Sequence, residues 1–172
     1  MNRSISHFTF ILLSTLIVSC TDTEKMQLVG KTIQETKAEY VPDSRVALFS
    51  ATASAKQNTI VLTGETSLPE AKASLLASLD QKNIAYADSI SVLPGAELGN
   101  EVYALVNNSV SNLRSEPKHS AQLATQAILG MPLKVLKKQG GWYLVQTPED
   151  YLSWVDSGGI TRVDKSTLAN WA

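Results

Sequence analysis

Acid–base or nucleophilic chemistry in this chain would have to use His119, because the other histidine, His7, precedes an apolar leader segment. Ser115 and Ser120 lie close to His119 in sequence, so a Ser–His–Asp arrangement is arithmetically possible. Neither serine, however, lies in a G-x-S-x-G elbow or a similar nucleophile setting. We therefore interpret His119 as an exposed loop residue and predict that the chain is not an enzyme.

Residues that bind metals or phosphate do not cluster either. The single cysteine and two histidines form no group, and the acidic residues do not recur at ligand spacings. The glycine pairs at 140–141 and 158–159 lack the lysine and helix that follow a phosphate loop. We read the adjacent Glu149 and Asp150 as a solvated turn, and we expect no metal and no cofactor.

The remaining chemical feature is a set of aromatic residues in the second half of the chain. Strand alternation places Trp142 and Tyr143 on opposite faces of one strand, and Trp154 and Tyr151 on opposite faces of the next. One interpretation is that all of them pack in or around a core. The other is that Tyr103, Tyr151 and one tryptophan line a groove for an extended peptide. The ligand-binding candidates are Tyr103, Arg114, Trp142, Tyr151 and Trp154. For Arg114, a bond to a ligand carboxylate and a structural hydrogen bond are both open.

Composition places these residues in a folded protein. The chain has 172 residues, is 44% hydrophobic and 18% charged, and carries a net charge of −1. A charge so close to zero gives no reason to expect nucleic acid as a partner.

The first nineteen residues are typical of a secretory signal. A twelve-residue apolar run over 8–19 is shorter than the roughly 20 residues that a membrane-spanning helix needs. It ends at Cys20, and Ile17, Val18 and Ser19 before it resemble a bacterial lipobox. We therefore expect a lipoprotein signal over 1–19 and lipidation of Cys20. A cleaved signal with a chance cysteine, or an uncleaved anchor, is the alternative.

The rest of the chain divides into a tether and two folded units. Residues 20–43 are mostly polar and predict a tether, with a short helix around 31–39 that Pro42 would end. Residues 44–94 predict two strands, a helix and a third strand. Ser67 and Glu70 fit a capping box for that helix, and Pro69 fits its first turn. Residues 95–101 predict a linker.

Residues 102–163 predict a small β-barrel, followed by a tail over 164–172. Short strand-like segments alternate with turn signals, as in small barrels, and we expect the aromatic residues to supply much of its core. The fold class is therefore mainly β with an α+β unit before it.

The segments "VSNLRSEPKHS", "GMPLKVLKKQGGWYLVQTP" and "YLSWVD" together resemble the bacterial SH3-like domain, over roughly residues 102–163. The matching residues are Asn112, Leu113, Arg114, Pro117, Trp142, Val145, Tyr151, Trp154 and Val155. Asp150 and Ser153 depart from that pattern, because glycines are common at these positions. Upstream, "VLTGETSLPEAKASLLASL" resembles the strand-to-helix segment of BON-type domains, which are thought to contact phospholipid or envelope partners.

The whole arrangement resembles the N-terminal, non-catalytic half of NlpC-type cell-wall peptidases, which are also called dipeptidyl-peptidase VI. These enzymes cut the γ-D-glutamyl–diamino-acid bond of peptidoglycan stem peptides, and their Cys/His catalytic domain follows the SH3-like domain. In some members a tyrosine of the SH3-like domain meets the free amino end of the stem peptide, and Tyr151 occupies that position. The accompanying acid has no counterpart, since Ala124 precedes Thr125 and Gln126.

The resemblance implies an envelope lipoprotein, anchored by lipid to the outer membrane on its periplasmic or outer side, that binds peptidoglycan or its stem peptide. One alternative is the N-terminal half of an endopeptidase that has lost its catalytic domain or works beside one. The other is a structural module that binds another envelope protein.

Overall fold

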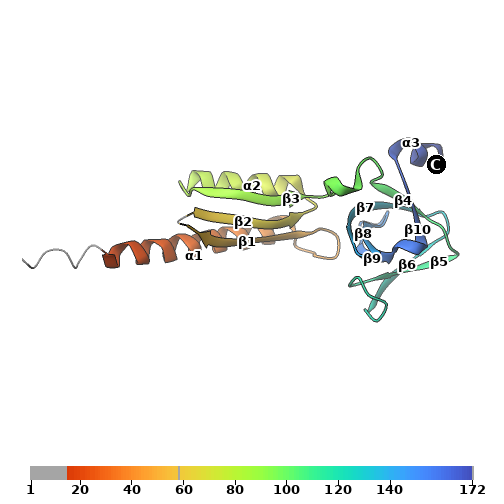
Figure 1. The fold of residues 1–172 in the computed structure, drawn as a ribbon, viewed down its shortest axis with the longest axis horizontal. Helices are drawn as coiled ribbons and strands as arrows, with labels where there is room; N and C mark the ends of the chain where they lie inside the picture. Colours follow the sequence, from red (N-terminus) through yellow and green to blue (C-terminus); the bar gives the residue numbers. More distant parts are fainter. Residues whose placement is uncertain (1–14, 58, 172) are drawn as a thin grey trace, which may run out of the picture.

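The computed structural model describes residues 15–57 and 59–171, with side chains from Asp22 onward. Most of the expected signal segment and the Cys20 side chain therefore lie outside the described part. The structure contains an N-terminal unit, followed by a unit built from a strongly curved sheet (Figure 1).

The N-terminal unit has the predicted strand–strand–helix–strand order. It comprises β1 (Phe49–Lys56), β2 (Thr59–Thr66), α2 (Pro69–Gln81) and β3 (Tyr86–Val92). The three strands form one sheet in the order β1-β2-β3, in which β1 and β2 are antiparallel and β2 and β3 are parallel. The α+β prediction for this part of the chain is confirmed.

Helix α2 buries the face that its sequence predicts. Ala71, Leu75 and Leu79 are fully buried, at the i, i+4, i+8 spacing of one helix face. Pro69 stands at the start of the helix, as expected. The predicted capping box is wrong, because no side chain caps this end of the helix. The Ser67 hydroxyl instead accepts a hydrogen bond from the Leu48 N–H at 3.0 Å and so ties the helix start to the sheet.

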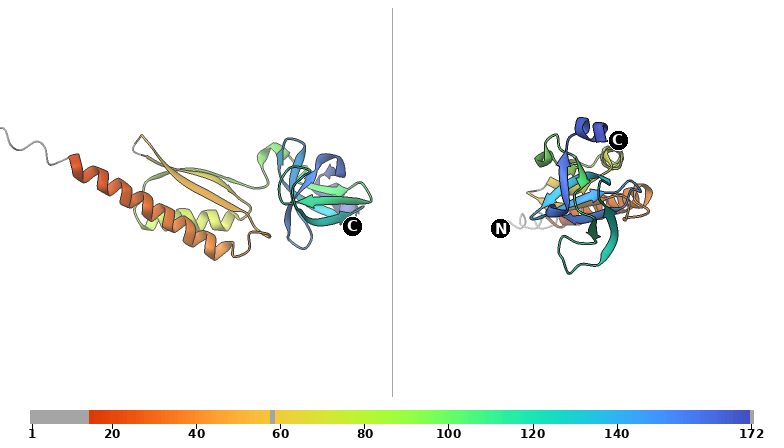
Figure 2. Two further views of the ribbon diagram at one scale, coloured as in Figure 1. Left: turned by 90° about the horizontal axis from the view of Figure 1, so that it is seen from below. Right: turned by 90° about the vertical axis from the view of Figure 1, so that its right-hand side faces the viewer.

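A long helix, α1 (Thr15–Tyr40), stands where the polar tether was predicted, and it includes the short helix expected around 31–39. It ends just before Pro42, as proline chemistry requires. Val29 and Ile33 are buried in the same cluster as Leu62 and Leu75, so this segment belongs to the core of the N-terminal unit. Helices α1 and α2 lie on the same face of the three-stranded sheet (Figure 2). The tether prediction is therefore wrong for the described part of this segment.

Helix α1 carries threonines where a buried helix face usually carries aliphatic residues. Thr32 and Thr36 are both buried, and their hydroxyls donate to the Leu28 and Thr32 carbonyls, each at 2.9 Å. These bonds remove the cost of burying the hydroxyls. Of the helices in residues 15–57 and 59–171, none is long and apolar enough to cross a membrane.

The C-terminal unit is a seven-stranded sheet in the order β10-β4-β7-β8-β9-β5-β6. Its strands are β4 (Tyr103–Val106), β5 (Val110–Arg114), β6 (Leu123–Ile128), β7 (Pro132–Gln139), β8 (Trp142–Gln146), β9 (Leu152–Asp156) and β10 (Ile160–Val163). All its paired strands are antiparallel. Among the described residues, the two edge strands β10 and β6 do not pair, so the sheet is open rather than a closed barrel. The SH3-like prediction for this unit is confirmed.

Two short helices flank this sheet. The 3-10 helix η1 (Ala96–Leu98) lies in the expected linker and buries Leu98 in the core of the C-terminal unit. Helix α3 (Lys165–Trp171) occupies the expected tail, and the Trp171 indole N–H donates to the Gly130 carbonyl at 3.1 Å. A further 3-10 helix, η2 (Ser157–Gly159), connects β9 to β10.

The core of the C-terminal unit is aliphatic rather than aromatic. Its buried residues include Val106, Leu113, Leu133, Val135, Val145, Val155 and Ile160. Of the aromatic residues expected there, Tyr143 alone is buried. Tyr103, Trp142 and Trp154 are half-buried, and Tyr151 is exposed. The prediction that aromatic residues supply much of this core is therefore wrong.

A third apolar cluster joins the two units. Leu93 directly follows β3, whereas Leu136 and Leu144 come from β7 and β8. Leu48, Leu152 and Trp154 pack against these three buried leucines. Backbone hydrogen bonds cross the same junction: the Leu152 N–H donates to the Arg45 carbonyl at 2.7 Å, and the Gly95 N–H donates to the Leu136 carbonyl at 2.8 Å.

Candidate ligand-binding pocket

Strand register brings three polar and aromatic side chains into one row on the outer face of the curved sheet. Leu113 of β5 pairs with Val155 of β9, and both are buried on the inner face. Because side chains alternate along a strand, their neighbours Asn112 and Asp156 point outward. Trp142 of β8 pairs with Asp156 and therefore shares that outer face.

Arg114 belongs to the next outward-facing row, because it pairs with Trp154 of β9. Its guanidinium Nη1 donates to the Ala121 carbonyl at 2.7 Å. This bond holds the end of the loop that connects β5 to β6 against the sheet. The structural hydrogen bond considered for Arg114 is thus present.

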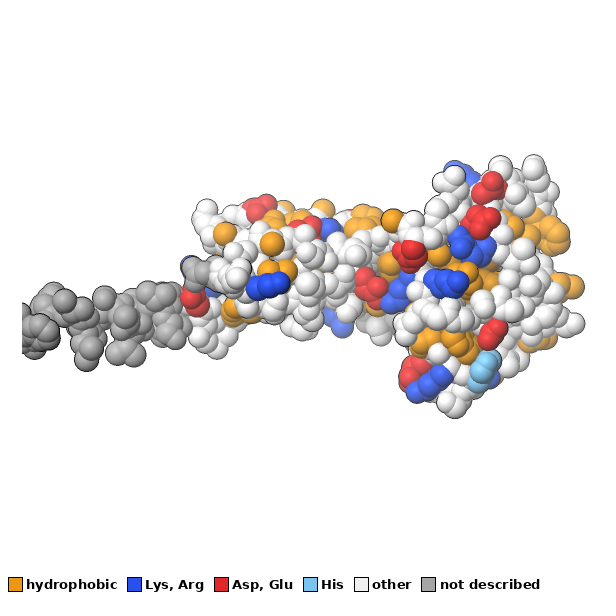
Figure 3. Space-filling model, viewed as in Figure 1, with side chains coloured by type: hydrophobic (Ala, Val, Ile, Leu, Met, Phe, Trp, Pro, Cys, Tyr) orange, Lys and Arg blue, Asp and Glu red, His pale blue; other side chains and the backbone are white. Residues whose placement is uncertain are grey.

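The loop over 115–122 folds back over this outer face and carries His119 with it. The Ser115 N–H donates to the Gln122 carbonyl at 3.0 Å, which closes the base of the loop. The His119 ring meets the Trp142 ring edge-to-face, with 5.0 Å between centroids. Its Nε2 lies 3.6 Å from Asp156 Oδ2. The space-filling view shows the histidine beside an acidic side chain at the surface of the C-terminal unit (Figure 3).

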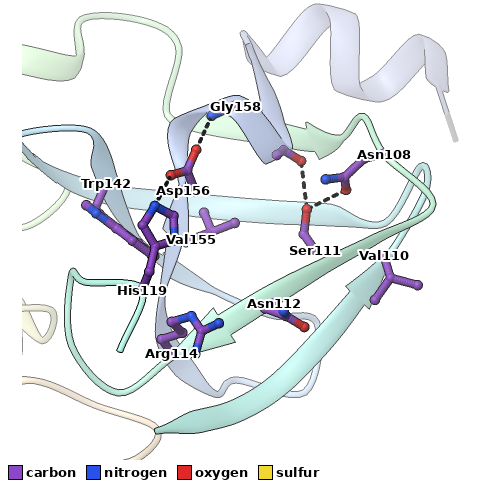
Figure 4. Close-up of a pocket in the computed structure, with 11 residues that line it drawn as sticks. Asn108, Val110, Ser111, Asn112, Arg114, His119, Trp142, Val155, Asp156 and Gly158 are labelled. Carbon is purple, nitrogen blue, oxygen red and sulfur yellow. Dashed lines mark hydrogen bonds and ion pairs between the residues drawn. The ribbon is translucent and has the colours of Figure 1, made fainter. Parts of the chain in front are cut away.

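These groups line a pocket of about 260 Å³ (Figure 4). Its remaining lining comes from Asn108, Val110, Ser111, Val155 and the glycines of η2. The Ser111 hydroxyl lies 2.6 Å from Asn108 Oδ1 and 3.0 Å from the Gly159 carbonyl oxygen, so this wall is internally hydrogen-bonded. This volume lies just below the roughly 300–1,000 Å³ of small-molecule sites, so the pocket accommodates only a short segment of peptide.

The charged groups of the pocket keep unused bonding capacity. Asp156 Oδ1 accepts from the Gly158 N–H at 2.8 Å, but among the described residues Oδ2 accepts no hydrogen bond. Within the same part of the chain, Arg114 Nη2 and Nε donate to no protein group. Within the part of the chain that the structure describes, the pocket therefore offers a ligand a carboxylate oxygen that accepts no hydrogen bond, 3.6 Å from His119 Nε2, and two guanidinium nitrogens with no protein acceptor.

Two of the predicted site residues, Arg114 and Trp142, line this pocket. The other three ligand-binding candidates, Tyr103, Tyr151 and Trp154, do not line it. Tyr103 is in β4 and pairs with Lys134 and Val163. Cys20, the predicted lipidation site, lies outside the part of the chain whose side chains are described.

Tyr151 and Trp154 lie toward the junction between the two units. The Arg45 guanidinium is 6.0 Å from the Tyr151 ring centroid, and Lys137 Nζ is 5.4 Å from that of Trp154. Arg45 also pairs with Asp43, and the hydrogen bonds from Arg45 lower the pKa of Asp43 to about 2. The groove predicted from Tyr103, Tyr151 and a tryptophan is therefore not assembled around the pocket.

Two pocket residues, His119 and Asp156, were not predicted. The sequence contains His119 only as a polar loop residue, and the structure agrees that it is exposed. The sequence does not predict that β5 pairs with β9, and this pairing places Asp156 beneath the loop. Asp156 follows the "YLSWV" segment, so strand alternation predicts that its side chain points outward. Strand alternation does not predict which strand pairs with β9.

Comparison with protein families supports the SH3-like fold. Residues 113–160 match the family model of the bacterial dipeptidyl-peptidase Sh3 domain. The matched segment runs from Leu113 in β5 to Ile160 in β10, and it contains Arg114, His119, Trp142 and Asp156. A search of curated proteins finds none that matches the chain.

Proposed function

We propose that this chain is a non-catalytic lipoprotein of the bacterial cell envelope whose SH3-like unit binds the stem peptides of peptidoglycan. The observation that carries this proposal is the pocket, which combines Arg114, Asp156 and an aromatic wall within the segment that matches a dipeptidyl-peptidase Sh3 domain. Stem peptides carry carboxylates and amines on short side chains, and such groups need charged partners at the protein surface. The proposed role is binding or targeting, and the pocket is the proposed binding site.

Sedimentation with purified cell wall tests this proposal. The wild-type chain is expected to pellet with cell wall at low salt, and Trp142→Ala is expected to lower the bound fraction severalfold. Trp171→Ala is the matched control, because Trp171 is an exposed tryptophan on α3 outside the pocket. Absence of wild-type pelleting at low salt would reject the proposal. A loss of binding in Tyr151→Ala but not in Trp142→Ala would move the site away from the pocket.

Lipid anchoring is the second part of the proposal, and it rests on the lipobox-like sequence that ends at Cys20. Several acyl chains, at about 0.8 kcal/mol for each buried methylene, hold a protein stably on a membrane. Cys20→Ser is expected to move the protein from the membrane fraction to the soluble fraction. An unchanged distribution would remove the lipoprotein assignment and leave the pocket proposal standing.

The N-terminal unit fits a BON-like role in the same setting. Its strand–strand–helix–strand order supports the likeness, and BON-type domains are thought to contact phospholipid or envelope partners. Such a contact would add a second attachment to the envelope beside the lipid.

The alternative function is that of a non-catalytic half of an NlpC-type endopeptidase. The match of residues 113–160 to a dipeptidyl-peptidase Sh3 domain favours it. In the NlpC-type peptidases that the chain resembles, a Cys/His domain follows the SH3-like unit. The nucleotide sequence downstream of the codon for Ala172 distinguishes the two. An in-phase segment encoding such a domain would support the endopeptidase, and its absence would support the binding lipoprotein.

A further inference from the structure

The pocket carries opposite charges at two separate places. Asp156 lies beside His119 and the glycines of η2, whereas Arg114 lies on the other side of the His119 ring, near Asn112 (Figure 4). The two groups form no ion pair with each other. A ligand that satisfies both must therefore carry a cation and an anion that are separated along its length.

The Asp156 end is built for a cation. Its Oδ2 accepts no hydrogen bond from the described protein, and His119 Nε2 lies 3.6 Å from it. The Trp142 ring stands against the same histidine, with 5.0 Å between centroids. An ammonium group at this end would meet a carboxylate oxygen beside the His119–Trp142 ring pair.

The Arg114 end is built for an anion. One guanidinium nitrogen is held by the Ala121 carbonyl at 2.7 Å, which fixes the orientation of the planar group. Nη2 and Nε remain available, and these two donors match the geometry of a carboxylate. Asn112 lies beside this end, and its Oδ1 is already occupied by the Gln126 amide at 3.0 Å, so its own N–H₂ group is the part left to face a ligand.

We infer that the pocket binds stem peptides that are not cross-linked, with the side-chain ammonium of the diamino acid at Asp156 and the free terminal carboxylate at Arg114. This inference rests on the proposed function and specifies its ligand. A cross-link converts that ammonium into an amide, which removes its positive charge. The pocket therefore distinguishes free stem peptides from cross-linked ones.

Peptide titration of the whole chain in detergent tests the inference without any mutation. The probe is the tetrapeptide acetyl-L-alanyl-γ-D-glutamyl-L-lysyl-D-alanine. It is compared with the same peptide acetylated on the lysine side chain and with the same peptide amidated at its C-terminus. Each modification removes one charge, and each is expected to weaken binding about tenfold.

Two variants connect each charge to its residue. Asp156→Asn is expected to bind the lysine-acetylated and parent peptides equally, and Arg114→Gln is expected to bind the amidated and parent peptides equally. Glu149→Gln is the matched control, because Glu149 is exposed and lies outside the pocket, and it should keep both preferences.

The outcomes separate the inference from the proposed function. If wild-type chain pellets with cell wall but binds all three peptides equally, the inference is wrong and the proposed function stands. If the chain binds neither cell wall nor any peptide, the proposed function fails as well.

Discussion

Lys137 of β7 and Glu65 of β2 form an ion pair that joins the C-terminal unit to the N-terminal unit. The same ammonium lies over the Trp154 ring, 5.4 Å from its centroid. Both charged side chains are partly buried, with 21% and 30% of their surface exposed. The junction between the units is therefore ionic at its edge and apolar at its centre, where Leu93, Leu136 and Leu144 meet.

Removing this ion pair is expected to destabilise the protein measurably. Lys137→Met keeps the aliphatic stem but leaves Glu65 without its partner, and we expect a loss of about 1–2 kcal/mol in the free energy of unfolding. Urea denaturation measures it. The matched control is Lys118→Met, because the Lys118–Glu116 pair has 55% and 60% of its side-chain surface exposed. Its loss should stay below about 0.5 kcal/mol, and equal losses in both variants would contradict a stabilising junction.

The ion pair between Lys72 and Asp88 predicts a pH-dependent contribution to stability. Lys72 Nζ lies 2.7 Å from Asp88 Oδ2, and the Ile90 N–H donates to Asp88 Oδ1 at 2.9 Å. Burial raises the pKa of Asp88, but these bonds outweigh it, and the pKa falls below its usual value of 3.8. Because the pKa of Asp88 is lower in the folded than in the unfolded state, its carboxylate stabilises the fold above about pH 4. This contribution to the free energy of unfolding is lost as the pH falls further.

Asp88→Asn isolates this contribution. At pH 7 we expect the variant to be less stable than the wild type by about 1 kcal/mol. This difference should shrink when urea denaturation is repeated at successively lower pH below about 4, as the wild-type carboxylate takes up its proton. A difference that stays constant between the two pH values would show that Asp88 does not act through its charge.

Helix α1 is expected to contribute to stability through one face only. Val29 is fully buried, whereas the neighbouring Leu28 is 39% exposed. Val29→Ala should cost about 2 kcal/mol of unfolding free energy, from lost burial and the cavity that remains. Leu28→Ala should cost markedly less. If both substitutions were near-neutral, α1 would not pack on the N-terminal unit in solution, as expected for a tether.

Local patterns predicted the elements whose buried residues are regularly spaced. Strand β7 (Pro132–Gln139) is one of the short strands expected within 102–163, because Leu133 and Val135 alternate with lysines. Helix α2 was expected because Ala71, Leu75 and Leu79 recur at helical spacing after Pro69. In both cases the regularly spaced buried residues all lie within one strand or helix, so the local sequence is enough to predict it.

Elements with few buried aliphatic residues were missed, as strand β6 was, or predicted only in part, as helix α1 was over 31–39. Strand β6 stands at the edge of the sheet and buries only Ala127, so its sequence shows no alternation. Helix α1 buries threonines beside Val29 and Ile33, and its composition is that of a polar segment. Predicting the pocket also requires knowledge of a long-range strand pairing, because Asn112 and Asp156 become neighbours only when β5 pairs with β9.

The pairing of β10 with β4 determines when the C-terminal unit can complete its fold during synthesis of the chain. The strands of the N-terminal unit find all their partners by Val92, so this unit is complete while later residues are still being added. In the C-terminal unit, Tyr103 pairs with Val163, and Ile160 fills the core beside Val106. A nascent chain that stops before Ile160 leaves one edge of β4 unpaired. The SH3-like unit is therefore the part of this protein most exposed to aggregation during its biosynthesis.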